Sequence, residues 1–261
     1  MSKNLKNGMS PPAKRLVGNI IYPLLSLGIV LAIWAISAKI VDKAILLPMP
    51  SEVVVKFFAL FSEQNFWVSV GGTIGRTMLS FVVSFVIALA FAVLGGLFKP
   101  IHRVMSPIVS ILRSIPTMAV ILIIMIFIDL QNAPIYIGFL IAFPILYSAF
   151  YSAIAGVDND LKEMVAIYKV RPMDKVRYLI IPSIAESVFD ASGSTLSLTL
   201  KVVIASEVLC HTLKSIGIEM QFANLTFEIS NLLAWTILAI ALSMALELVV
   251  YGIKKLWEAT R

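Results

Sequence analysis

Residues 77–98 read TMLSFVVSFVIALAFAVLGGLF, a run of 22 residues without a charged side chain. An α-helix needs about 20 apolar residues to cross the hydrocarbon core of a bilayer, so this run predicts a membrane-spanning helix. The composition of the whole chain agrees, because 59% of its 261 residues are hydrophobic and only 14% are charged. A soluble domain has about 45–50% apolar and about 25% charged residues. The sequence therefore favours a membrane protein over a soluble enzyme.

Further apolar segments lie on both sides of this run. Together they predict an all-α membrane protein with a single transmembrane domain over residues 1–261. Proline within such segments is tolerated where neighbouring helices or water satisfy the freed carbonyl groups. We expect about six spans, over residues 17–38, 77–98, 104–128, 134–156, 187–208 and 229–253.

The distribution of positive charge predicts how these spans are oriented. Of the 21 Lys and Arg residues, 14 fall in segments 1–16, 99–103, 158–185 and 254–261, which share one side of the membrane in a six-span topology. Positive residues concentrate in cytoplasmic segments, so both termini are expected in the cytoplasm.

The sequence offers no catalytic or cofactor-binding constellation. Cys210 is the only cysteine, and His102 and His211 lack the spacing of metal ligands. There is no Gly-x-x-x-x-Gly-Lys loop for nucleotide, and the positive charges form no basic face with interleaved aromatic residues for nucleic acid. We therefore expect a chain that is not an enzyme and binds no metal, cofactor or nucleic acid. If it transports a solute, the energy must come from a gradient or from a partner ATPase.

Charged residues inside the expected spans are costly in hydrocarbon and point to function. Arg113 lies roughly 14 Å into its span, at about 1.5 Å per residue. Lys201 is similarly deep in the span 187–208. Two readings remain open: either Arg113 or Lys201 faces a pathway and helps to hold an anionic substrate, or both pair with acidic residues and lock the helices together. The acidic residues within reach of such pairing are Asp190, Glu207 and Glu247.

A possible break in the span 104–128 strengthens the pathway reading. Pro116 cannot donate a backbone hydrogen bond, and broken helices can line a cavity in transporters. The candidate pathway residues are Arg113, Ser114, Pro116, Thr117, Lys201 and Glu207.

The loop 158–182 is the most informative cytoplasmic segment. Asp158 to Asp160 offer caps for a short helix over about 161–169, and Arg171-Pro172 ends that helix, because proline disfavours helix at the preceding residue. A second amphipathic stretch, 173–181, leads into the next span. Two short helices at an angle would make a peg that fits a groove on a partner; the alternative is a solvated loop between spans.

This loop resembles the coupling loop of ABC importer permeases, whose pattern is Glu-Ala-Ala, then a glycine, then a closing Ile-x-Leu-Pro. Glu163 matches the glutamate, Met164 and Val165 stand at the alanine positions, and Lys169 stands at the glycine position. The closing element keeps its spacing as Leu179-Ile180-Ile181-Pro182. Lys169 therefore departs from the family pattern, in which a glycine at this position would allow a tight turn.

Four more segments resemble one branch of that family, the permeases of the nitrate, sulfonate and taurine group. These segments are LPMPSEV at 47–53, TIGRT at 73–77, LRSIP at 112–116 and LKVVIASE at 200–207. The segments occur in the family order, and the resemblance covers about 45–255.

The resemblance implies a type I ABC importer permease in a prokaryotic inner or plasma membrane. It implies a homodimer of permeases surrounded by membrane lipid, ATPase subunits that bind ATP and Mg²⁺, and an extracytoplasmic binding protein that delivers the solute. The implied ATPase-coupling residues are Glu163, Met164, Val165, Ala166, Tyr168, Lys169, Arg171 and Pro172. The implied solute is a small organic or inorganic anion. A pyrimidine, a thiamine precursor or a riboflavin-like solute is the alternative.

A transporter of a different class remains an alternative on sequence alone. A gradient-driven secondary transporter would carry inverted repeats in many of its known folds, and no internal repeat is visible in this chain.

Overall fold

The computed structural model describes residues 12–43, 45–168 and 170–260, and at 12–20, 23, 159, 162, 166 and 172 it describes the backbone only. Every regular element in this part of the chain is helical. In chain order the elements are α1 (Pro12–Val41), α2 (Pro50–Leu60), α3 (Phe66–Leu97), α4 (Lys99–Ser114), α5 (Thr117–Phe127), α6 (Ala133–Ala155), α7 (Asn159–Ile167), α8 (Pro172–Lys175), the π-helical turn η1 (Val176–Ile180), α9 (Ile181–Cys210), α10 (Ile216–Leu225) and α11 (Ile229–Ala259).

The expectation of an all-α chain with about six spans is confirmed. Within the described residues, five helices or continuous helical segments are long and apolar enough to cross a membrane, and α4 with α5 makes a sixth if the bent pair counts as one span. The expected span 104–128 is not straight, because α4 and α5 meet at 98°. Ile115 is extended, with φ −72° and ψ 127°, as expected of a residue that precedes proline.

Several helices begin earlier than the expected spans, and α3 and α9 extend furthest. α3 begins at Phe66 rather than at 77, so Arg76 lies inside a helix. α9 begins at Ile181 rather than at 187 and continues directly from η1. In both cases a helix extends past charged or polar residues that hydropathy alone would place in a loop.

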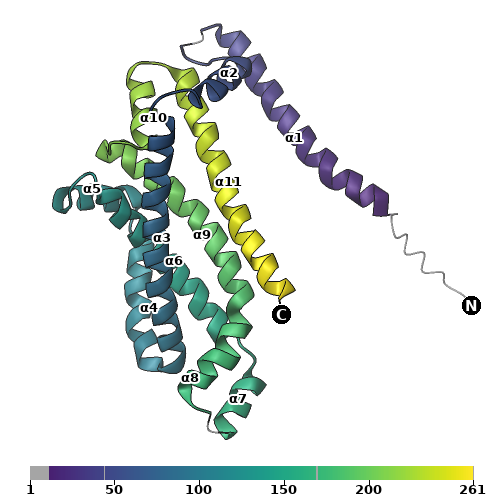
Figure 1. Cartoon of the computed structure of the whole chain (residues 1–261), viewed down its shortest axis with the longest axis vertical. Coiled ribbons are helices and arrows are strands. Elements are labelled where there is room, and N and C mark those ends of the chain that lie inside the picture. Colours follow the sequence, from purple (N-terminus) through teal and green to yellow (C-terminus); the bar gives the residue numbers. More distant parts are fainter. Residues whose placement is uncertain (1–11, 44, 169, 261) are drawn as a thin grey trace, which may run out of the picture.

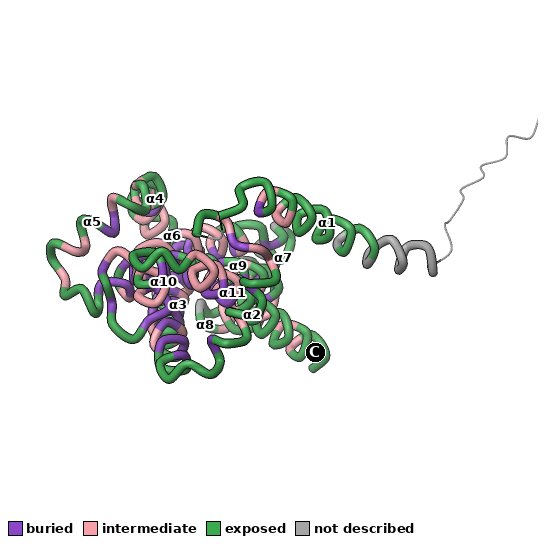
Figure 2. Tube along the Cα trace, turned by 90° about the horizontal axis from the view of Figure 1, so that it is seen from above, coloured by how far each residue is buried: buried purple, intermediate pink, exposed green. Residues whose placement is uncertain are grey.

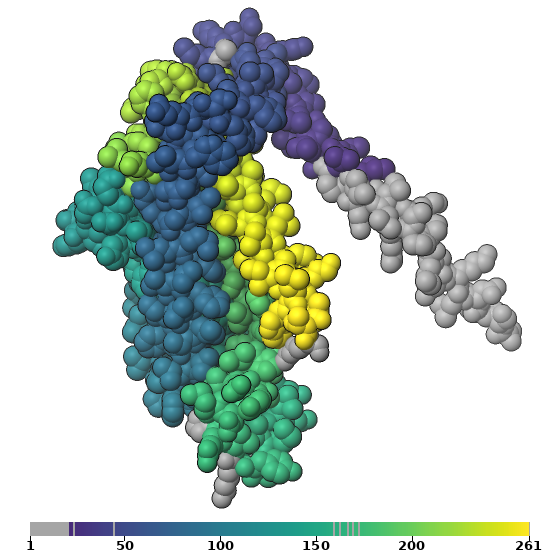
Figure 3. All heavy atoms as spheres, viewed as in Figure 1, coloured from purple at the N-terminus to yellow at the C-terminus, as the bar shows by residue number. Residues whose placement is uncertain are grey.

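Figure 1 shows how the helices are arranged. α6 packs between α3 and α9, and α11 packs along α9. α2 and α10 lie at one end of the bundle, while α7 and α8 lie at the opposite end, where they project beyond the bundle in the space-filling view (Figures 1 and 3). α1 leans away from the other helices, and most of its described surface is exposed (Figure 2).

Small and hydroxyl-bearing residues let α3 and α6 approach closely. Ser80 donates to the backbone carbonyl of Ile135 at 2.9 Å, and Ser84 donates to that of Phe139 at 3.3 Å. A Cβ atom on Gly138 would lie 2.8 Å from Ser80 Oγ, so this crossing leaves no room for a side chain. Such contacts replace the hydrophobic driving force that is weak between helices in lipid.

Candidate functional site

A buried ion pair ties three helices together near the α2–α10 end. Arg76 Nη1 of α3 lies 2.9 Å from Glu207 Oε1 of α9, and the Glu207 side chain is fully buried. The other carboxylate oxygen of Glu207 accepts from Thr73 Oγ1 at 2.8 Å and from the backbone N–H of Gly217 at 3.3 Å. Glu207 therefore has partners on α3 and α10, and its charge is compensated within this chain.

The same cluster fixes the turn between α9 and α10. Arg76 also donates to the carbonyl oxygens of Leu213 at 2.9 Å and Lys214 at 3.3 Å. The backbone N–H of Ile216 donates to Thr73 Oγ1 at 2.9 Å. Gly217 is required here, because a Cβ atom at that position would lie 2.4 Å from Glu207 Cβ. We name Thr73, Arg76, Glu207 and Gly217 the sealed cluster.

Arg113 and Lys201 have a different environment from Glu207. Both side chains are exposed, and Arg113 donates to Ser148 Oγ at 3.3 Å. Within the described residues, neither side chain forms an ion pair, whereas Asp190 pairs with Lys254 at 2.8 Å and Glu207 pairs with Arg76. Of the three acidic residues that the sequence offers as partners, Asp190, Glu207 and Glu247, none pairs with Arg113 or Lys201 in the part of the chain that the structure describes.

Lys201 belongs to an exposed stripe along α9. Ser187, Ser194 and Lys201 recur every seven residues, so they share one face of the helix, and all three are exposed. The neighbouring Val202 packs in one cluster with Ile121 of α5. The stripe therefore reaches the depth at which α5 contacts α9.

The break between α4 and α5 gathers the other candidate pathway residues. Ser114, Pro116 and Thr117 are exposed around the break, and Ser114 Oγ donates to the carbonyl of Ser110 at 2.7 Å. Arg113 lies one residue before Ser114 at the end of α4. We name Arg113, the α4–α5 break and Lys201 the open charges region. Glu207 is the candidate pathway residue that lies elsewhere, in the sealed cluster.

The predicted coupling loop forms the end of the molecule opposite α2 and α10. α7 begins where Asp158 accepts from the backbone N–H of Asp160 at 3.0 Å, which matches the capping expected from sequence. Glu163 and Arg171 are exposed, and Tyr168 is 76% exposed. Met164 is also exposed and Val165 is half-buried. For Ala166 and Pro172 only the backbone is described, and Lys169 lies outside the described residues.

Among the residues that the structure describes, no group of three or more His, Cys, Asp or Glu side chains lies close enough to hold a metal ion.

Comparison with known sequences identifies the family. The profile of the family described as binding-protein-dependent transport system inner membrane component matches residues 84–259. The chain belongs to this family. It is therefore the transmembrane subunit of a binding-protein-dependent ABC importer in the inner membrane, and ATP hydrolysis is the task of a separate subunit. The gradient-driven alternative is set aside by this match.

Solved structures show the same fold for this permease. A chain of the methionine ABC transporter MetNI, in an inward-facing native crystal form, has a TM-score of 0.64 and 21% identity, and the match covers 71% of this chain and 92% of that one. The selenomethionine-soaked crystal form gives 0.65 and 20%, covering 73% and 96%. An amino acid ABC transporter with histidines gives 0.60 and 20%, covering 80% and 97%. No curated protein matches the chain.

Proposed function

We propose that two copies of this permease form a pathway for a small anion, such as nitrate, a sulfonate or taurine. The observation that carries this proposal is the open charges region: Arg113 and Lys201 are exposed within the spanning helices and have no carboxylate partner among the described residues. A cation at this depth is costly unless it faces a pathway or meets an anion. An anionic solute would supply the missing countercharge during transport.

The second copy supplies the opposite wall of the pathway. The stripe through Ser194 and Lys201 leaves polar groups uncovered on α9, whereas the exposed parts of α3 and α11 are mainly apolar, with Glu247 as a charged exception within the span of α11. Polar groups in a membrane protein face the protein interior or water rather than acyl chains. Facing stripes from two copies would place both Lys201 side chains on one central path.

The segment 158–182 couples ATP hydrolysis by the partner ATPase to movement of the permease helices. α7 and α8 expose apolar side chains at the end of the molecule, including Met164, Ile167 and Met173. Exposed apolar groups of this kind suit a groove on a partner protein. The coupling contact is proposed for Glu163, Met164, Val165, Ala166, Tyr168, Lys169, Arg171 and Pro172. ATP and Mg²⁺ would be bound by the partner ATPase, and a binding protein would dock at the α2–α10 end.

Identification of the solute begins with the binding protein encoded with this permease. Its thermal unfolding is measured with nitrate, taurine and an alkyl sulfonate, and in parallel with pyrimidine, thiamine-precursor and riboflavin-like compounds. An increase in unfolding temperature with one of the anions is expected. A shift produced only by an uncharged aromatic compound would overturn the anion proposal and leave the importer assignment intact.

The coupling contact is tested separately by charge reversal at Glu163. Glu163→Lys is expected to reduce co-purification of the ATPase with the permease, because the substitution places a positive group at the centre of the proposed contact. Glu52→Lys is the matched control, since Glu52 is also exposed but lies on α2 at the opposite end. Equal recovery of the ATPase with both variants would contradict the proposed role of 158–182.

A further inference from the structure

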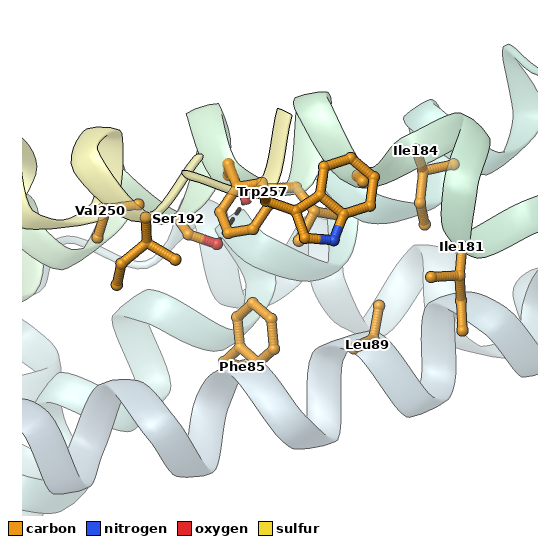
Figure 4. A pocket seen from close by; sticks show the side chains of 11 residues that line it. Phe85, Leu89, Ile181, Ile184, Ser192, Val250 and Trp257 are labelled. Atoms are coloured by element: carbon orange, nitrogen blue, oxygen red, sulfur yellow. Dashed lines mark hydrogen bonds between the residues drawn. The ribbon is translucent and has the colours of Figure 1, made fainter. Parts of the chain in front are cut away.

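The contact between α9 and α11 separates an apolar flank from a charged one. On the apolar flank, Phe85 of α3 and Val250 of α11 help to line a groove that has no charged residue in its lining (Figure 4). Phe189 of α9 and Trp257 of α11, with ring centroids 6.0 Å apart, border this groove on one side and a pocket lined by Lys254 on the other. Lys254 therefore lies on the flank opposite the groove.

Glu247 of α11 lies on the charged flank. It precedes Lys254 by seven residues, which is about two helical turns, so the two residues share a face of α11. Lys254 Nζ lies 2.8 Å from Oδ1 of Asp190 on α9. A Cβ atom on Gly193 would lie 3.7 Å from Glu247 Cγ, so the Glu247 side chain lies across α9 at the residue that precedes Ser194. Glu247 therefore borders the exposed stripe to which Ser194 belongs.

Glu247 also lacks a countercharge. Its side chain is exposed, and it forms no ion pair among the residues that the structure describes, whereas Lys254 on the same face is paired with Glu186 and Asp190. Glu247 lies 12 residues before the end of α11 at Ala259, which is about 18 Å at about 1.5 Å per residue. A carboxylate at this depth is costly in lipid and faces a pathway or a partner charge. A cation from outside the described part of this chain is therefore needed to compensate it.

We infer that this cation is an ammonium group of the solute, so that the importer carries a short zwitterion rather than a simple anion. The inference rests on the proposed function, in which Lys201 holds the anionic group. Lys201 lies eight residues after Gly193 on α9, about 12 Å along the pathway at about 1.5 Å per residue. A charged hydrogen bond of about 2.8 Å at each end leaves about 6 Å between the charged atoms of the solute. A chain of about two or three carbon atoms between an amine and a sulfonate, phosphonate or carboxylate spans such a gap, at about 1.5 Å per bond.

Charge complementarity favours a zwitterion over a simple anion. Glu247 and Lys201 border one pathway and carry opposite charges, so the solute that matches both has one positive and one negative group. Glu247 is the nearer of the two to the end that carries α7 and α8, because Gly193 is closer than Lys201 to the start of α9. An anion such as nitrate would be attracted by Lys201 and then repelled by Glu247 as it moves toward the cytoplasm. The ammonium group of a zwitterion removes this repulsion.

The test uses the full importer in proteoliposomes and pairs of compounds that differ in one group. Taurine is paired with isethionate, in which a hydroxyl replaces the ammonium group, and aminoethylphosphonate and β-alanine are paired with their hydroxyl counterparts in the same way. The affinity of the binding protein for each compound is measured first, and uptake is compared at concentrations that saturate the binding protein. We expect the wild-type importer to prefer the ammonium member of a pair.

Variants of Glu247 then test whether this residue sets the preference. Glu247→Gln should lower the ratio of ammonium to hydroxyl uptake by about 10- to 100-fold, because it removes one charged hydrogen bond. Glu247→Asp keeps the carboxylate and should retain most of the preference, which separates charge from packing. Glu258→Gln is the matched control, since Glu258 is an exposed glutamate of α11 beyond the expected span 229–253. Thermal unfolding of the same samples reports whether each variant is folded.

Three results would overturn the inference. One is equal uptake of the ammonium and hydroxyl members by the wild-type importer. Another is a loss in Glu247→Gln that is the same for both members, as expected if Glu247 pairs with the second copy of the permease. The third is uptake of nitrate in preference to every zwitterion, which would leave the anion pathway standing, whereas uptake of an uncharged solute alone would contradict the proposed function as well.

Discussion

Ionisable residues lie inside the spanning helices in two different environments, the sealed cluster and the open charges region. Glu207 is fully buried and bonded to Arg76, Thr73 and the backbone of Gly217. Arg113 and Lys201 are exposed, and among the described residues they have no acidic partner. An intramembrane charge is therefore not by itself evidence of a substrate site. Glu207 is compensated within the chain and holds α3, α9 and α10 together, whereas Arg113 and Lys201 are the charges that the proposed function assigns to a solute.

The largest effect is expected from breaking the sealed cluster. Arg76→Leu leaves the Glu207 carboxylate buried without its countercharge, which costs about 3–5 kcal/mol. Such a loss is a large part of a total stability of about 5–15 kcal/mol. We expect little folded permease, measured as monodisperse protein after purification and by thermal unfolding.

A double variant separates charge from packing in this cluster. Arg76→Leu with Glu207→Leu removes both charges, and it should be more stable than either single variant. If the double variant is as unstable as the sum of the two single variants, the ion pair is not the reason for the loss.

Substitutions in the open charges region should reduce solute uptake and leave the stability of the fold unchanged. Lys201→Gln and Arg113→Gln are each expected to reduce uptake by about 10- to 100-fold, which corresponds to the loss of one charged hydrogen bond worth about 1.5–3 kcal/mol. Uptake is measured with the full importer in proteoliposomes, and thermal unfolding is measured on the same samples. Lys99→Gln is the control, because Lys99 is exposed at the start of α4. Loss of the folded complex, or unchanged uptake, would contradict the proposed role.

Local sequence signals predicted the helices well but not the partners of the charges. Hydropathy over about 20 residues reports whether a helix can sit in lipid, so the all-α fold and the number of spans followed from composition. Pro116 marked the place of the α4–α5 break. The 98° bend did not follow, because the angle between two helices depends on how each packs against its neighbours, such as the packing of Ile121 of α5 with Ile137 of α6 and Val202 of α9.

The pairing of Glu207 shows more clearly that local sequence does not reveal contacts between distant segments. Arg76 lies 131 positions away in the chain, so no local pattern could join the two. The expected span 77–98 leaves Arg76 outside the membrane, because hydropathy counts its charge as unfavourable, whereas the structure neutralises Arg76 inside α3. One usable signal was present: Thr73 and Arg76 are three residues apart on the face that meets α9 and α10.

A smaller test within the sealed cluster is Thr73→Val, which keeps the shape of the side chain and removes its hydroxyl. Thr73 Oγ1 donates to Glu207 and accepts from the N–H of Ile216. Leaving these groups without a partner should cost about 1–3 kcal/mol, less than the loss of Arg76. Thermal unfolding checks this, with Thr117→Val as the exposed control. Equal unfolding temperatures for the two variants would show that the hydroxyl adds nothing to the ion pair.

The smallest expected effect on stability is that of Glu63. This residue lies between α2 and α3, outside the spans, and belongs neither to the sealed cluster nor to the open charges region. Partial burial, followed by the nearby negative charge of Glu219, raises the pKa of the Glu63 carboxyl above its ordinary value of 4.5, against a lowering effect of Lys56. The folded protein therefore binds this proton more tightly than the unfolded chain does, and this contribution to stability is lost as pH rises through the raised pKa. Glu63→Gln should flatten the dependence of unfolding temperature on pH above about 4.5, with only a small change because the side chain is exposed. An unaltered pH profile would mean that the Glu63 carboxyl has the same environment in the folded and unfolded states, in contrast to the buried carboxylate of the sealed cluster.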